Sequence, residues 1–165
     1  MALYTKQFSS KDDYMTPFSA WEDIREFLPK DKVVWEAFYG DGKSGEYLRS
    51  LGCDVIHEDI DFFEHDLGEC IVSNPPFSKS RQVLERLREM EKPFILLLPA
   101  GKLFTKYYRA AFGNDPDMSL IIPPKRINFM PLKDGEVDVS YKSNCAFDCI
   151  YYCWRMGIKE RIIHL

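Results

Sequence analysis

Residues 32–51 read KVVWEAFYGDGKSGEYLRSL and contain a strand, a glycine turn and a helix in succession. The apolar segment Lys32–Phe38 predicts a buried strand. Tyr39–Gly42 predicts a turn whose glycines let the backbone approach a ligand closely. Ser44–Leu51 predicts a helix that ends at Gly52. This succession is the unit of open α/β sheets, in which ligands bind beyond the carboxyl ends of the strands.

The rest of the chain continues the alternation of strands and helices. Further strands are expected at Cys53–His57, Cys70–Ser73, Phe94–Leu98, Met118–Ile122, Ile127–Met130 and Cys145–Trp154. Helices are expected at Lys79–Met90, capped by Ser78, and at Lys102–Phe112. We therefore predict a single α/β domain over residues 1–165, with a doubly wound sheet whose last strands form an antiparallel edge. The polar loop Pro131–Asn144 is long enough to have a function of its own.

The composition argues against several classes of protein. The five cysteines are odd in number and form no CxxC pattern, which argues against a disulfide framework or a zinc knuckle. The polar N-terminus does not resemble a signal peptide, and no apolar run approaches the length that spans a bilayer. We expect a reduced, cytoplasmic protein without a membrane partner.

The net charge of -4 hides an uneven distribution. Residues 36–70 contain ten acidic and two basic side chains, whereas residues 79–133 contain eleven basic and five acidic ones. The first segment would suit a cationic cofactor and the second would suit phosphates. Two ordinary solvated faces would give the same counts.

The glycine turn allows two functional interpretations. Ala37–Ser44 satisfies a relaxed P-loop pattern, but such an enzyme also needs an acid at the end of another strand to hold magnesium, and the strand Cys70–Ser73 is followed by Asn74. Alternatively, backbone N–H groups at the start of the helix hold a carboxylate while Glu36 or Asp41 faces an ammonium group. S-adenosylmethionine carries both groups. A tight turn without a ligand is the third possibility.

The acidic segment His57–Asp61 follows the second predicted strand. In nucleoside-binding folds an acid at this place accepts ribose hydroxyls, and Glu58 or Asp59 could do so. Asp61 could accept from an adenine amino group, with Phe62 packing on the ring. The alternative is a solvated acidic turn.

The segment Ser73–Phe77 (SNPPF) is the most specific feature of the chain. Two prolines directly after an apolar strand continue neither a sheet nor a helix, so they stiffen the chain. The Asn74 side-chain oxygen and the Pro75 carbonyl are two fixed acceptors for the two N–H groups of an amine. Phe77 supplies a face on which a flipped base can stack. A site that holds an amine by two fixed acceptors would catalyse a reaction of that amine mainly by positioning and electrostatic preorganisation.

Asn74-Pro75-Pro76-Phe77 resembles the catalytic motif of amino-methyltransferases, above all the adenine-N6 DNA methyltransferases. The resemblance implies S-adenosylmethionine as cofactor and methyl transfer to the N6 amino group of adenine in DNA. It also implies a Rossmann-like class I methyltransferase fold, with a mostly parallel seven-stranded sheet and an antiparallel last strand.

Other motifs extend the resemblance over about residues 14–154. Tyr14–Phe18 (YMTPF) is similar to the N-terminal cofactor motif of the family, and Glu36–Gly42 (EAFYGDG) to its cofactor loop, although Glu-Ala-Phe replaces the usual Asp-Pro-Phe. The cofactor-binding residues implied are Thr16, Pro17, Phe18, Glu36, Phe38, Gly40, Asp41, Gly42, Glu58, Asp59, Asp61 and Phe62.

The chain departs from the family pattern because it has no room for a target-recognition domain. Only 38 residues separate Glu36 from Asn74, and only eleven follow Trp154. Recognition would then come from loops, from basic residues beside the pocket such as Lys79 and Arg81, or from a homodimer or partner subunit. RNA adenine and protein glutamine remain alternative acceptors, and a non-catalytic subunit is an alternative class. A compact enzyme of this kind would suit a phage, a virus or a mobile element.

Overall fold

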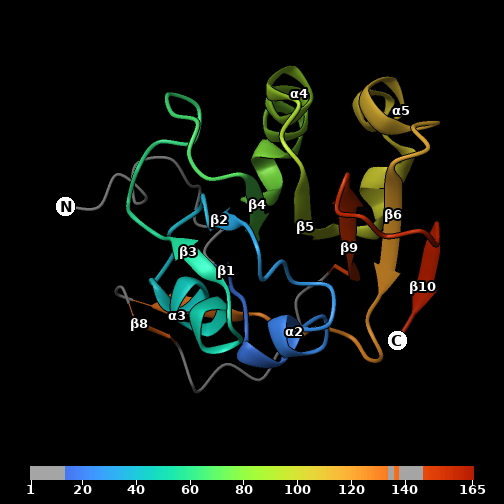
Figure 1. The fold of residues 1–165 in the computed structure, drawn as a ribbon. Coiled ribbons are helices and arrows are strands. Elements are labelled where there is room, and N and C mark those ends of the chain that lie inside the picture. The colour runs from blue at the N-terminus through green and yellow to red at the C-terminus, as the bar shows by residue number, and fades with distance from the viewer. Residues whose placement is uncertain (1–13, 134–135, 138–146) are drawn as a thin grey trace.

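The computed structural model describes residues 14–133, 136–137 and 147–165 as an α/β protein (Figure 1). A seven-stranded sheet has the order β10-β6-β9-β5-β4-β2-β3. Its strands are β2 (Val33–Trp35), β3 (Asp54–Ile56), β4 (Cys70–Ser73), β5 (Phe94–Pro99), β6 (Met118–Ile122), β9 (Cys149–Trp154) and β10 (Ile162–His164). The prediction of a seven-stranded, mostly parallel sheet with an antiparallel strand is therefore confirmed.

The position of the antiparallel strand differs from the prediction. β9 is antiparallel to both β5 and β6 and lies between them, whereas the last strand, β10, is parallel to β6 and forms the edge. The burial pattern gives the reason. All six residues of β9 are buried, as a central strand requires, while the two ends of β10 are exposed.

Helices cover the two faces of the sheet. The helices are α2 (Phe18–Glu22), α3 (Lys43–Ser50), α4 (Ser80–Met90) and α5 (Lys106–Phe112), with 3-10 turns η1 (Phe77–Lys79) and η2 (Ala100–Phe104). In Figure 1, α4 and α5 lie on one side of the sheet and α2 and α3 on the other. α4 packs through Val83, Leu84 and Leu87, which are fully buried and form one apolar stripe along the helix.

The predicted helix Lys102–Phe112 is interrupted. Thr105 has an extended backbone, and its hydroxyl accepts a hydrogen bond from the Tyr108 backbone N–H at 3.3 Å. A threonine that caps a helix in this way cannot also lie inside one, so η2 ends and α5 begins at this residue. In the part of the chain that the structure describes, no helix is both long and apolar enough to cross a membrane.

A second, small sheet lies apart from the large one and has the order β1-β7-β8, with β1 (Tyr14–Met15), β7 (Met130–Lys133) and β8 (Glu136–Val137). The strand predicted at Ile127–Met130 is wrong in position and in sheet, because Pro123 and Pro124 directly after β6 carry the chain out of the large sheet. β1 pairs antiparallel with β7, and Tyr14 lies opposite Pro131 in this pairing. Most of the predicted loop Pro131–Asn144, and the start of the strand predicted at Cys145–Trp154, lie outside the described residues.

The winding of the sheet reverses at β2. After β2 the chain forms β3 on one side of it and then β4 on the other. Ligands of open α/β sheets bind where the winding reverses, in the crevice beyond the carboxyl ends of the strands. Here these ends carry Glu36 and Asn74.

Candidate functional site

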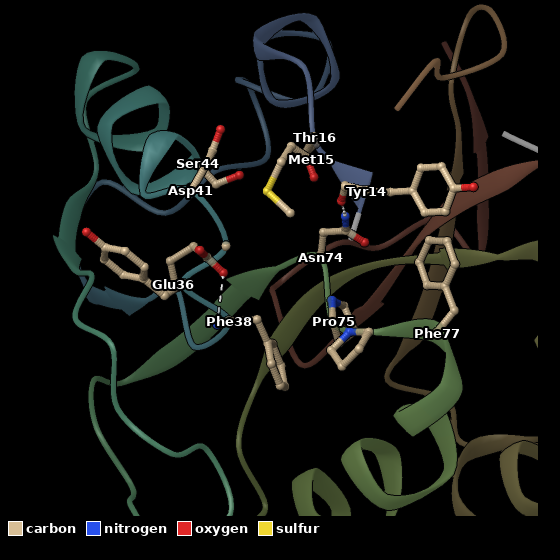
Figure 2. Close-up of a pocket in the computed structure, with 13 residues that line it drawn as sticks. Tyr14, Met15, Thr16, Glu36, Phe38, Asp41, Ser44, Asn74, Pro75 and Phe77 are labelled. Carbon is tan, nitrogen blue, oxygen red and sulfur yellow. Dashed lines mark hydrogen bonds between the residues drawn. The ribbon is translucent and has the colours of Figure 1, made fainter. Parts of the chain in front are cut away.

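A pocket opens at this reversal (Figure 2). Three segments far apart in the sequence supply the walls: β1, the turn after β2 and the segment after β4. The lining residues are Tyr14, Met15, Thr16, Glu36, Phe38, Tyr39, Gly40, Asp41, Ser44, Asn74, Pro75, Pro76 and Phe77. The structure therefore brings the predicted Thr16, Glu36, Phe38, Gly40 and Asp41 together with the whole tetrad Asn74–Phe77.

Met15 forms the wall of the pocket opposite the glycine turn. Its side chain reaches toward Gly40, where an added Cβ atom would meet the Met15 sulfur at 2.9 Å. Gly40 also has a φ of +62°, in the left-handed region that glycine adopts without strain. Both observations explain why a glycine follows Tyr39.

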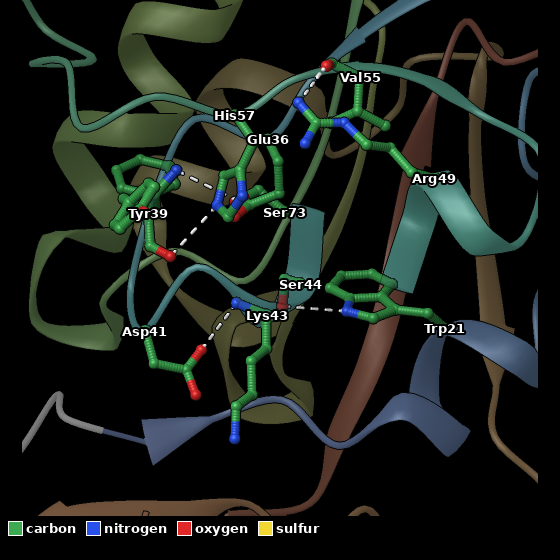
Figure 3. A network of polar contacts seen from close by, with 11 residues as sticks. Trp21, Glu36, Tyr39, Asp41, Lys43, Ser44, Arg49, Val55, His57 and Ser73 are labelled. Carbon is green, nitrogen blue, oxygen red and sulfur yellow. Dashed lines mark hydrogen bonds and ion pairs between the residues drawn. The ribbon is translucent and has the colours of Figure 1, made fainter. Parts of the chain in front are cut away.

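Glu36 is the centre of a buried polar network (Figure 3). Its side chain is 1% exposed, and Oε1 accepts hydrogen bonds from the Ser73 hydroxyl and from the Phe38 backbone N–H. Oε2 lies 2.9 Å from His57 Nε2. Three protein groups thus engage the carboxylate that was predicted to face a ligand ammonium. Its principal contribution is to hold the end of β2 and the start of the turn.

His57 contacts Glu36 from outside the residues that line the pocket, and no role was predicted for its side chain. Its Nε2 lies between Glu36 Oε2 and the Tyr39 carbonyl oxygen, which is 3.2 Å away, so this nitrogen carries the proton. Burial lowers the pKa of His57, but the hydrogen bond and the charge of Glu36 outweigh burial and raise the pKa above its ordinary value. The Tyr39 ring stacks on the imidazole at a centroid distance of 4.6 Å.

The other side of the His57 ring lies against α3. A Cβ atom on Gly45 would come within 1.9 Å of His57 Nδ1, so only glycine fits there. A glycine inside a helix is unfavourable by about 1 kcal/mol relative to alanine, and this unfavourable choice was the one signal of the contact in the sequence.

Asp41 presents a buried, unsatisfied acceptor to the pocket. Oδ1 accepts from the Lys43 backbone N–H at 3.0 Å, at the start of α3. Oδ2 is buried and has no hydrogen-bond partner among the described residues. A carboxylate oxygen without a partner in a closed site favours a cationic ligand group, because an unpaired buried acceptor is costly.

The same turn disfavours the P-loop alternative. Asp41 already lies at the helix start where phosphates would bind, and its negative charge would repel them. Lys43 is exposed, and Figure 3 shows its side chain pointing away from the Glu36 network. The Ser44 hydroxyl accepts a hydrogen bond from Trp21 Nε1 at 3.1 Å.

Asn74 also has a buried acceptor without a partner. Its Nδ2 donates weakly to the Tyr14 carbonyl oxygen at 3.4 Å, and only a donor fits opposite that carbonyl. Oδ1 consequently points the other way, and among the described residues it has no hydrogen-bond partner. In Figure 2 this oxygen turns toward the side of the pocket that carries the rings of Tyr14 and Phe77, whereas Glu36 and Asp41 lie on the opposite side of Asn74.

The prolines and Phe77 complete this segment. The Pro76 carbonyl accepts from the Lys79 backbone N–H at 3.0 Å, which forms the η1 turn. Phe77 is 8% exposed and packs edge-to-face on Phe129 at 6.0 Å and on Phe147 at 5.6 Å. Tyr14, the first residue of the motif Tyr14–Phe18, supplies a second aromatic ring beside it in Figure 2.

No protein-family model and no curated protein gives a significant match to this chain.

Several predicted residues lie away from the pocket. Phe62 is 1% exposed and packs on Trp35 and Phe38, with centroid distances of 5.7 and 5.0 Å. Phe62 thus fills the core beneath Phe38, and Phe38 is the one of the two that lines the pocket. Asp61 Oδ1 accepts from the Phe63 backbone N–H at 2.8 Å within a local turn.

The remaining predicted residues also lie outside the walls of the pocket. Glu58 is exposed and Asp59 half-buried on the segment after β3. Gly42 precedes α3, Pro17 precedes α2, and Phe18 packs on Tyr47. Of the two residues predicted to contact nucleic acid, Lys79 is half-buried in η1, and Arg81 is exposed and pairs with Glu85 at 2.9 Å.

Proposed function

We propose that this protein is an S-adenosylmethionine-dependent methyltransferase that acts on the N6 amino group of adenine in DNA. The observation that carries the proposal is Asn74 Oδ1, which is buried at the reversal of the sheet, lies on the side of the two aromatic rings in Figure 2, and has no hydrogen-bond partner within residues 14–133, 136–137 and 147–165. An acceptor kept in this state is ready to receive a hydrogen bond from a ligand, and an exocyclic amine next to a flat ring supplies both features.

The opposite side of Asn74 has the character that the cofactor requires. Asp41 Oδ2 is a buried carboxylate oxygen with no hydrogen-bond partner in the part of the chain that the structure describes, which suits the ammonium group of S-adenosylmethionine. Thr16, Phe38 and Gly40 would line the same part of the pocket. When bound, the cofactor supplies an already activated methyl group.

The residues of the chain then orient the acceptor. Asn74 Oδ1 accepts one N–H of the amine and the Pro75 carbonyl accepts the other, which fixes the direction of the nitrogen lone pair. Pro75 and Pro76 limit backbone movement, so these acceptors are preorganised. Phe77 and Tyr14 hold the base plane. We further assign the sheet to the Rossmann-like class I methyltransferase fold, because its ligand site lies at the switch point.

The proposal is tested by incubation with labelled S-adenosylmethionine and unmodified duplex DNA, single-stranded DNA, RNA or protein. We expect label in adenine of DNA. Asn74→Ala should lower the transfer rate about 10²–10³-fold, the usual effect of removing one preorganised hydrogen-bonding group. Asn114→Ala, at an exposed asparagine, is the matched control and should leave the rate unchanged.

Other outcomes would replace the proposal. Robust transfer by Asn74→Ala would remove the role assigned to this side chain. Label only in RNA or in protein glutamine would change the acceptor class. If calorimetry detected no binding of S-adenosylmethionine, a non-catalytic subunit would be the better description, and binding of magnesium-ATP would revive the P-loop alternative.

A further inference from the structure

A second pocket, of about 850 Å³, shares Phe77 with the first. It lies at the carboxyl end of β5, which ends at Pro99, and Lys102, Thr105 and Phe147 belong to its walls. The two pockets are thus neighbours that share the first residue of η1.

Two aromatic side chains line this second pocket, and a third lies on the adjoining segment of the chain. The rings of Phe77 and Phe147 meet edge-to-face at 5.6 Å, with an interplanar angle of 88°. Phe104 lies between two residues that line the pocket, Lys102 and Thr105, and it is 75% exposed. A phenylalanine with this exposure contributes little to the core, and its ring is accessible for stacking on a flat ligand.

The charge next to these rings is positive. Lys102 is half-buried in the wall, and Lys106 is exposed at the start of α5. The structure records no ion pair for either lysine within the described residues. The acid that follows Phe147, Asp148, is paired with Arg126 at 3.2 Å, so its charge is balanced. Apolar rings beside an unpaired cation match a nucleobase and its phosphate.

We propose that the second pocket binds the nucleobase next to the target base in a nucleic-acid strand, with Phe104 stacking on that strand and Lys102 facing the intervening phosphate. The inference rests on the proposed function, because a strand whose target base reaches Asn74 must continue past Phe77. Stacking accepts any base, since every base has an aromatic face. This contact would hold DNA without a recognition domain.

The test measures the binding of fluorescent oligo-thymidylate to the full chain by anisotropy, because this probe has no adenine and needs no methyl transfer. Phe104→Ala should weaken binding about tenfold or more, as loss of a base-stacking ring does, and Phe104→Trp should restore it. Lys102→Gln should reduce the slope of log affinity against log salt by about 0.7, the value for one phosphate on a single strand.

Ile162→Ala is the matched control. Ile162 is 59% exposed on β10, at the far edge of the sheet, so this variant should bind the oligonucleotide like the wild type. Equal affinity of Phe104→Ala and wild type would overturn the inference. The inference would also be overturned if sedimentation showed that Phe104→Ala mainly loses self-association. The surface around Phe104 would then bind a second copy of the protein. If the protein transferred no methyl group but Phe104→Ala still weakened oligonucleotide binding, only the proposed function would be rejected.

Discussion

Gly45→Ala should destabilise this protein, although alanine is the better helix former. The added Cβ atom would lie 1.9 Å from His57 Nδ1, well inside van der Waals contact, and the nearby ring carbon is at 2.2 Å. The His57 ring cannot retreat freely, because Tyr39 stacks on its other side. The substitution therefore expels the ring and removes a partner of the buried Glu36 carboxylate.

The magnitude follows from two opposing effects. Breaking a buried charged pair costs about 3–5 kcal/mol, and replacing glycine by alanine in a helix returns about 1 kcal/mol. The net loss should be roughly 2–4 kcal/mol, which lowers the melting temperature by roughly 5–15 °C for a domain of this size.

Urea denaturation and thermal melting measure this loss directly. Gly101→Ala is the matched control, because a Cβ atom there meets no atom within 4 Å, and its stability should stay within about 0.5 kcal/mol of wild type. Gly45→Ala/His57→Ala should be no less stable than Gly45→Ala alone, since both changes remove the same contact. A Gly45→Ala protein as stable as wild type would refute the steric reasoning.

Three further predictions concern the pH response, the cofactor site and a buried thiol. The raised pKa of His57 means that its stabilising contribution is fully present below its ordinary pKa of about 6.5 and declines as the pH rises through the folded-state pKa. Denaturation curves between pH 6 and 9 should record this decline, and His57→Gln should abolish it. Asp41→Asn keeps an acceptor for the Lys43 N–H but removes the negative charge. Calorimetry should therefore find the affinity for S-adenosylmethionine lowered about tenfold or more. Asp54→Asn, at an exposed aspartate, is the control and should leave this affinity unchanged. Burial raises the pKa of Cys70 to about 11, so mass spectrometry should find this thiol unlabelled by iodoacetamide at pH 8 in the native protein and labelled in urea.

Each of these has a contrary outcome. If the stability of wild type and of His57→Gln depended on pH in the same way, the pKa of His57 would not differ between the folded and the unfolded protein. Unchanged cofactor affinity in Asp41→Asn would place the ammonium elsewhere. Rapid native-state labelling of Cys70 would mean that β4 opens far more readily than its burial implies.

The strands of the large sheet were predictable where apolar runs have clear borders. β4 and β6 begin and end at the predicted residues, Cys70–Ser73 and Met118–Ile122, because an acidic residue precedes each strand and a polar residue or a proline follows it. β10 was missed because only three residues pair and its ends are exposed, so Ile162–His164 has no periodic pattern to detect.

The candidate site was predictable in its motifs and not in its contacts. Local sequence identified Gly40, Asp41 and Asn74, because turn and proline chemistry acts over a few residues. It could not pair Tyr14 with Pro131, which depends on a strand pairing between distant segments. Local sequence also could not show which of Phe38 and Phe62 lines the pocket and which is buried in the core, since both are aromatic and only tertiary packing distinguishes them.

The central position of β9 has a consequence for biosynthesis. β5 and β6 leave the ribosome before β9 does, yet neither pairs with the other, because β9 separates them in the sheet. Until residues 149–154 are synthesised, the nascent chain presents two unpaired strand edges that face an empty place in the sheet. Open edges of this kind recruit strands from other chains, and non-local pairing closes slowly. The yield of native protein should therefore depend on how quickly this one strand is inserted, and chaperones that shield strand edges are the helpers we expect it to need.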